Sequence, residues 1–386
     1  MLPSPSPDAR LHSQRVTEHI RAALDAHAGW IDFAHYMNLA LYAPGLGYYV
    51  AGATKFGAAG DFVTAPELSP LFGRTLALQV AQILQETGGD LMELGAGSGK
   101  LAVDVLLQLE QQNVLPTHYF ILEVSAELQA RQHATIATGA PHLVERVSWL
   151  STLPAHFKGV ILANEVLDAL PVHCVQWQGE KLYERGVAWD DARFVWQARE
   201  LTSGALWQSA QALGVNCDSP DAPYISEISL AIPALIQALA ATLAYGAIIF
   251  IDYGFPKREY YHSQRHMGTL RAHYRHHALD DPFFLPGLCD LTSHVDFSAL
   301  TQAATQSGLK LAGYTSQAGF LMNAGITSLL IQTSPENAAA YLPQANAVQR
   351  LISPAEMGEL FKVAGFSRNC DSPWLGFTHG NRAHTL

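Results

Sequence analysis

The sequence predicts an α/β protein built on a mostly parallel, doubly wound sheet. Short apolar runs alternate with helical patterns from about residue 90 onward, as repeated strand–helix units require. A glycine-rich turn joins a strand to a helix at 91–101, which is typical of sheets that bind nucleotide-like ligands. The chain has 386 residues and is 49% hydrophobic, so it can bury a large core.

The elements follow in order along the chain. Helices are expected at 13–28, 30–42 and 70–86, with a long loop rich in glycine and aromatic residues at 42–73. Strands are expected near Leu91 and at 117–124, 147–149, 160–163 and 247–252, with two more near 309–316 and the C-terminus. Helices are expected between them at 126–137, 229–244 and 295–306. Alternation at 172–177, 181–189 and 193–198 predicts a β meander inserted after the fourth strand, and 203–223 is expected to be irregular.

Composition excludes several classes of protein. The formal net charge of -11 argues against nucleic-acid binding. No run of eighteen apolar residues occurs, so no membrane span is expected. The four cysteines form no CxxC pair, and the N-terminus resembles neither a signal nor a transit peptide, which predicts a cytoplasmic protein of a bacterial type rather than one of the mitochondrial matrix. The histidine-rich segment 257–277 has neither cysteines nor well-placed acids, so no metal site is expected.

The turn LMELGAGSGKL at 91–101 is compatible with three cofactor classes at first sight. A dinucleotide fingerprint would need a third glycine where Lys100 stands. A phosphate-binding loop would need glycine at Leu94 and a hydroxyl at Leu101. The E/D-x-G-x-G-x-G turn of class I S-adenosylmethionine methyltransferases fits at every position, with Glu93, Gly95, Gly97 and Gly99.

Acidic side chains stand at the ends of two of the predicted strands. Glu123 ends the second strand, where an acid accepts hydrogen bonds from ribose hydroxyls. Asn164 and Glu165 end the fourth, and Asp168 comes three residues later. If a helical turn begins there, both carboxylates lie on one side of it and could hold a guanidinium, although Asn164 and Asp168 could instead cap a helix. Glu227, before the long apolar helix, is expected to serve in capping.

Several longer blocks together resemble one family, the MidA-like proteins, which are related to the mitochondrial complex I assembly arginine methyltransferase. The blocks are GDFVTAPELSPLFG (60–73), MELGAGSGKL (92–101), ILEVS (121–125), ANEVLDALPV (163–172), IDYGFP (251–256), GTLRAHYRHHALDDPFFLPGLCDLTSHVDFSAL (268–300) and MGELFKV (357–363). The resemblance implies a class I methyltransferase fold and S-adenosylmethionine as cofactor, held by the three glycines and Glu123. It also implies that the block 60–70 covers the cofactor, with Asp61, Thr64 and Glu67 as contributors.

The resemblance leads to a specific functional expectation. The chain is expected to be a protein arginine N-methyltransferase, whose protein substrate is a subunit of the respiratory NADH dehydrogenase or a similar protein. Glu165 would orient the guanidinium, with Asp168 or Glu67. The alternatives are a non-catalytic assembly factor that binds the cofactor, a small-molecule methyltransferase and a nicotinamide oxidoreductase, which Lys100 disfavours.

The same reading predicts the domain organisation. Residues 1–88 would form an N-terminal helical extension with the covering loop. Residues 89–386 would form the methyltransferase core, with insertions at about 173–224 and 255–293.

Overall fold

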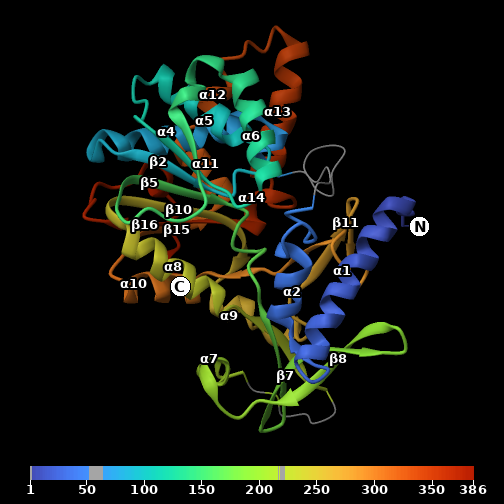
Figure 1. Cartoon of the computed structure of the whole chain (residues 1–386). Coiled ribbons are helices and arrows are strands. Elements are labelled where there is room, and N and C mark those ends of the chain that lie inside the picture. The colour runs from blue at the N-terminus through green and yellow to red at the C-terminus, as the bar shows by residue number, and fades with distance from the viewer. Residues whose placement is uncertain (1, 52–63, 216, 218–221) are drawn as a thin grey trace. The chain divides into compact units, whose positions relative to one another are not determined.

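The computed structural model describes residues 2–51, 64–215, 217 and 222–386 (Figure 1). Contacts group the chain into two units. The first contains Met1–Phe62, Asp168–Ala234 and Lys257–His294, and the second contains Val63–Leu167, Leu235–Pro256 and Val295–Leu386. Residues 64–88 therefore fall with the second unit in this division, whereas the sequence-based domain prediction placed them in the N-terminal extension.

The second unit is built on an eight-stranded sheet in the order β15-β16-β10-β5-β2-β3-β4, with β14 beside β10. Its strands are β2 (Asp90–Leu94), β3 (Tyr119–Leu122), β4 (Val147–Leu150), β5 (Phe157–Asn164), β10 (Leu243–Phe255), β14 (Val295–Asp296), β15 (Lys310–Ser316) and β16 (Phe361–Arg368). The pairs among β4, β3, β2, β5 and β10 are parallel, and β16 is antiparallel to both of its neighbours. This sheet confirms the predicted α/β class.

Helices cover both faces of this sheet. They are α3 (Ala65–Leu68), α4 (Pro70–Thr87), α5 (Lys100–Gln111), α6 (Ala126–Gly139), α10 (Phe297–Gln306), α11 (Gln317–Ala324), α12 (Ile326–Leu330), α13 (Ala338–Ile352) and α14 (Met357–Leu360), with 3-10 turns at Pro141–Arg146, Leu375–Phe377 and Ala383–Thr385. Figure 1 shows α4, α5 and α6 on one side of the sheet and α10 on the other. Residues Ala247 to Ile251 of β10 are almost fully buried, as a strand covered on both faces requires.

The order of the strands reverses between β2 and β5. From β2 the chain moves through β3 and β4 toward one edge, and it then returns to β5 on the other side of β2. Open α/β sheets bind ligands at the carboxyl ends of the strands at such a switch point. The glycine-rich turn follows β2, and Glu165 follows β5, so both lie at this position.

The first unit contains the predicted β meander. Its five-stranded sheet is formed by β1 (Ile31–Asp32), β6 (His173–Gln178), β7 (Lys181–Asp190), β8 (Arg193–Glu200) and β9 (Tyr224–Ile228). A three-stranded sheet is formed by β11 (Arg271–Tyr274), β12 (His277–Leu279) and β13 (Asp290–Thr292). The helices are α1 (Pro7–Ala26), α2 (Phe33–Tyr42), α7 (Gly204–Leu213) and α9 (Lys257–Tyr260), with a 3-10 turn at Ser263–Arg265, and α8 (Ala231–Thr242) contains the boundary between the units.

Two predictions in this region were wrong. Residues 203–223 are not irregular throughout, because α7 buries Leu206 and Ala210 four residues apart on one face. Glu227 does not cap a helix but lies buried in β9, where its carboxylate accepts hydrogen bonds from the backbone N–H groups of Thr269 and Leu270. A Cβ at Gly268 would lie 2.1 Å from Glu227 Oε1, which explains the glycine there. No helix among the described residues is long and apolar enough to cross a membrane.

Candidate active site

The turn after β2 is shaped by three glycines with left-handed backbones. Gly95, Gly97 and Gly99 have φ values of 62°, 53° and 85°, which L-residues rarely adopt. A Cβ at Gly99 would also lie 3.0 Å from Gln132 Cα, so α6 packs directly against this turn. Helix α5 begins at Lys100, and its first N–H groups therefore face the turn.

The short helix α3 is tied to the same turn. Glu67 accepts a hydrogen bond on Oε1 from the Ser98 hydroxyl, and its backbone oxygen accepts one from Lys100 Nζ at 3.2 Å. Thr64 is the residue that precedes α3, and it is half-buried. Asp61 lies outside the described residues. The carboxylate of Glu67 thus orders the glycine turn, a contact that the sequence did not predict.

Glu123 is the centre of a polar network beyond β3. Its Oε1 accepts a hydrogen bond from the Ser125 N–H at 2.9 Å, and its Oε2 accepts one from Gln132 Nε2 at 3.1 Å. Gln132 also donates to the Gly97 carbonyl oxygen at 3.2 Å and accepts from Trp149 Nε1 at 2.8 Å. Gln132 therefore links the acid, the glycine turn and β4. Sequence analysis missed it, because a glutamine inside a helix carries no motif.

Glu93 lies inside the sheet rather than on its rim. It is 2% exposed, and Tyr119 donates a hydrogen bond to its Oε2 at 2.7 Å. Burial raises the pKa of Glu93 to about 7, although the hydrogen bond from Tyr119 lowers it. Its hydrogen bond with Tyr119 joins β2 to β3 two residues before the glycine turn begins.

This pKa has a consequence for stability. The folded protein keeps a proton on Glu93 between its ordinary pKa of 4.5 and about 7, whereas the unfolded chain loses it. The contribution of Glu93 to stability should therefore fall as the pH rises from 4.5 to 7, by about 3 kcal/mol in all. In urea unfolding between pH 5 and pH 8, Glu93→Gln should gain stability relative to the wild type as the pH rises. Parallel pH profiles for the two proteins would contradict this origin.

The turn after β5 carries the second group of residues. Glu165 has a left-handed backbone with φ 53°, and its N–H donates to the Ile251 carbonyl oxygen at 2.9 Å. Asn164 Nδ2 donates to Glu165 Oε1 at 3.2 Å. A Cβ at Gly95 would lie 3.5 Å from Val166 Cγ2, so this turn lies directly beside the glycine turn.

Asn164 also offers an unused acceptor. Its Oδ1 is buried and, within the described part of the chain, has no hydrogen-bond partner. A buried carbonyl oxygen without a partner costs about 1–3 kcal/mol, so it calls for an explanation, and a functional role is one. The residues of the site therefore fit a polar ligand that donates a hydrogen bond beside the glycine turn.

Asp252 fixes the same turn from β10. It is 1% exposed, and its Oδ2 accepts a hydrogen bond from the Leu167 N–H at 2.9 Å, while its Oδ1 accepts from the Tyr253 N–H. The carboxylate thus fastens the end of the loop that begins at Glu165. Residues that hold such a loop act on the chemistry through position rather than contact.

Asp168 lies in different surroundings from those expected. The segment from Glu165 to Leu170 forms bends and a turn rather than a helix, so neither the shared helical face of Glu165 and Asp168 nor a capping role applies. Asp168 is buried within the first unit, where its backbone oxygen accepts from the Ser293 N–H at 3.0 Å. Its charge is one of those that add to burial in raising the pKa of Tyr49.

Comparisons with known proteins agree with this geometry. A family model described as "Putative S-adenosyl-L-methionine-dependent methyltransferase" matches residues 75–315. "Protein arginine methyltransferase NDUFAF7, mitochondrial" from Danio rerio is 30% identical over 91% of this chain and 86% of the relative. The protein of the same name from Homo sapiens is 31% identical over 86% of this chain and 79% of the relative.

A solved structure is closely similar over the whole chain. It is a COG1565 superfamily member from Burkholderia thailandensis bound to S-adenosyl-homocysteine, with 50% sequence identity, a TM-score of 0.96 and complete coverage of both chains. Together, these findings confirm the predicted family, cofactor and class of enzyme. The chain belongs to this family of S-adenosyl-L-methionine-dependent methyltransferases.

Proposed function

We propose that the chain methylates an arginine side chain of a protein, and that this protein is a subunit of the respiratory NADH dehydrogenase or a similar protein. Two relatives named as protein arginine methyltransferases support the arginine acceptor. The observation that carries the proposal is the left-handed backbone of Glu165 beside the glycine turn. Residues with such strained backbones persist only where the surrounding structure stabilises them, and they gather at functional sites.

The cofactor would lie across the turns after β2 and β3. The backbones at Gly95, Gly97 and Gly99 allow close approach, and Glu123 would accept hydrogen bonds from the ribose hydroxyls. Asn164 would use its buried Oδ1 as an acceptor. When bound, S-adenosylmethionine supplies a methyl group that its sulfonium already activates. The protein then needs to align the acceptor and to stabilise charge.

Glu165 would supply that alignment. A carboxylate holds a guanidinium by two parallel hydrogen bonds, which fixes the direction of the remaining nitrogen. Glu67 already binds Ser98 and Lys100 at the glycine turn, so we assign it to ordering the cofactor site rather than to the acceptor. Asp168 as a second acid for the guanidinium, and Thr64 and Asp61 as cofactor contacts, stay predictions, as does a cytoplasmic location.

Asp252 should act as a positioning residue for this reaction. In Asp252→Asn, one of the two backbone N–H groups faces an amide NH₂, so the loop from Glu165 to Leu167 loses part of its support. We expect kcat to fall about 10-fold while the dissociation constant of the cofactor changes little, since a hydrogen bond to a charged group contributes about 1.5–3 kcal/mol.

The matched control is Asp90→Asn. Asp90 also accepts a hydrogen bond from a backbone N–H, that of His118 at 2.8 Å. It lies at the start of β2, whereas the glycine turn follows the end of this strand. It should lower the melting temperature without lowering kcat. Equal losses of kcat in the two variants would show that Asp252 acts only through stability.

Incubation with methyl-labelled S-adenosylmethionine and an extract of cells that lack this protein tests the proposal. We expect label in a protease-sensitive fraction, with an equal amount of S-adenosylhomocysteine. Label in small molecules would instead indicate a small-molecule methyltransferase. Cofactor that binds without turnover would indicate a non-catalytic assembly factor. Either of the last two results contradicts the proposal.

A further inference from the structure

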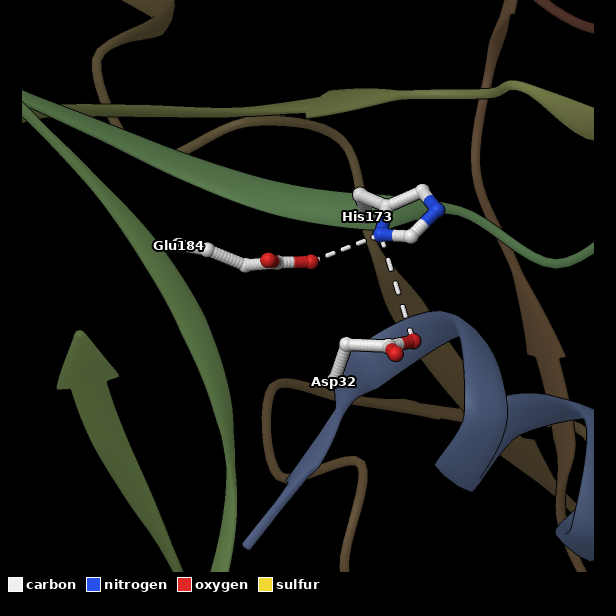
Figure 2. Close-up of side chains that lie close together, drawn as sticks. All are labelled: Asp32, His173 and Glu184. Carbon is white, nitrogen blue, oxygen red and sulfur yellow. Dashed lines mark hydrogen bonds and ion pairs between the residues drawn. The ribbon is translucent and has the colours of Figure 1, made fainter. Parts of the chain in front are cut away.

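A cluster of three metal-ligating side chains lies in the first unit, on elements that carry none of the cofactor residues. Figure 2 shows Asp32, His173 and Glu184 pointing toward one another from β1, β6 and β7. One ligand atom from each lies within 4.8 Å of the other two. The side chains are 33%, 20% and 17% exposed, so they are held by the fold yet open to solvent.

Strand pairing explains why these residues meet. Strand β8 pairs with β7 from Tyr183 to Asp190, so β6 and β1 share the other edge of β7. Along β7, the pairing with β6 stops at Arg185, which faces Cys174 at the start of β6. The pairing with β1 begins at the next residue, Gly186, which faces Asp32 at the end of β1. The start of β6 and the end of β1 therefore adjoin beside Gly186.

The three ligand atoms lie close enough together to share one ion. His173 Nδ1 lies 2.7 Å from Glu184 Oε1 and 3.9 Å from Asp32 Oδ1. One proton on Nδ1 can serve the first of these contacts, but the second is too long for a hydrogen bond. Two carboxylates thus face a single imidazole nitrogen, and a divalent cation would balance their charge and bind all three atoms.

Neighbouring groups restrain one ligand, Asp32, and hold the arginine that stands opposite another, Glu184. Asp32 Oδ1 accepts the His35 N–H at 2.8 Å and so caps α2, which restrains the carboxylate. Arg199 stands opposite Glu184 in the pairing of β7 and β8, but its guanidinium lies 4.4 Å from the centre of the Trp30 ring. A cation–π contact therefore holds this arginine.

We propose that Asp32, His173 and Glu184 bind a divalent transition metal, with water completing its coordination. One imidazole and two carboxylates suit zinc or a similar first-row ion rather than calcium, which takes oxygen ligands alone. The ion joins the segment at the start of α2 to the β meander, and these two segments lie far apart in the sequence. Its role is structural, and it is independent of the methyl-transfer proposal.

Zinc binding to metal-stripped protein without a polyhistidine tag tests this site. Equilibrium dialysis should show one equivalent of zinc in the wild type that Glu184→Gln loses or binds at least about 10-fold more weakly. Asp32→Asn should behave alike, and it keeps the helix cap because asparagine also caps helices. Cobalt bound to the wild type should give the visible absorption of a site with a low coordination number. Cobalt added to Glu184→Gln or Asp32→Asn should not give this absorption.

Two controls make the result decisive. Glu110→Gln removes the acid of the exposed His142–Glu110 pair, for which no third ligand lies in the described part of the chain, and it should keep the full zinc content. Zinc should raise the melting temperature of the wild type but not of Glu184→Gln. Equal zinc content and equal melting shifts in all the proteins would overturn the site. In that case, the ion pair between His173 and Glu184 would be enough to explain the cluster. Methyl transfer is not a readout here, so its failure would not affect this test.

Discussion

Glu165→Gln should lose methyl transfer while it retains the cofactor. The amide keeps the size of the side chain but cannot accept two hydrogen bonds from a guanidinium or balance its charge. Loss of hydrogen bonds to a charged group costs about 1.5–3 kcal/mol, so kcat should fall about 10- to 100-fold. The dissociation constant of S-adenosylhomocysteine, measured by calorimetry, should stay within about 2-fold of the wild type.

A control separates this effect from a general effect of removing a carboxylate. Glu145→Gln changes an exposed glutamate in the turn Pro141–Arg146, and it should leave kcat unchanged. If Glu165→Gln transfers methyl groups at the rate of the wild type while the cofactor is bound, Glu165 does not orient the acceptor.

Glu123→Gln should produce the opposite pattern. The carboxylate is held by Ser125 and Gln132, and Gln132 also donates to the Gly97 carbonyl oxygen of the glycine turn. An amide would place an NH₂ group against one of these donors and lose charged hydrogen bonds to the ribose. The cofactor should bind about 10- to 100-fold more weakly, whereas kcat at saturating cofactor should change little.

The matched control for this variant is Gln129→Ala. Gln129 donates to the backbone oxygen of Glu123 at 2.7 Å and does not touch the carboxylate in any described contact. The dissociation constant of the cofactor from Gln129→Ala should stay close to that of the wild type. Equal weakening in both variants would mean that the shape of the strand end matters and the charge of Glu123 does not.

The sheet and its glycine turn were predictable because their signals are local. The run at 247–251 is apolar without interruption, which predicts a strand covered on both faces, and β10 is such a strand. Gly95, Gly97 and Gly99 need left-handed backbones, which few other residues adopt. Helix α7, which lies within 203–223, was not predicted, because a glycine- and serine-rich stretch hides the apolar spacing of Leu206 and Ala210.

The contacts that organise the site were not predictable, because they join residues far apart in sequence. Gln132 meets Gly97, and Asp252 meets Leu167, only after β2, β3, β5 and β10 have aligned. Asp32 meets His173 for the same reason. Side chains of this kind have no spacing that a motif could describe. The family resemblance predicted the chemistry. The geometry shows that Glu67 and Asp252 support turns, and we propose Glu165 as the acid that orients the acceptor.

Mass spectrometry of the labelled protein tests the central claim most directly. The wild type should add methyl groups to the guanidinium of an arginine in a subunit of the respiratory NADH dehydrogenase or a similar protein, and Glu165→Gln should methylate that arginine about 10- to 100-fold more slowly at equal cofactor occupancy. Methylation of a lysine, a carboxylate or a terminal amine, with arginine unmodified, would contradict the account.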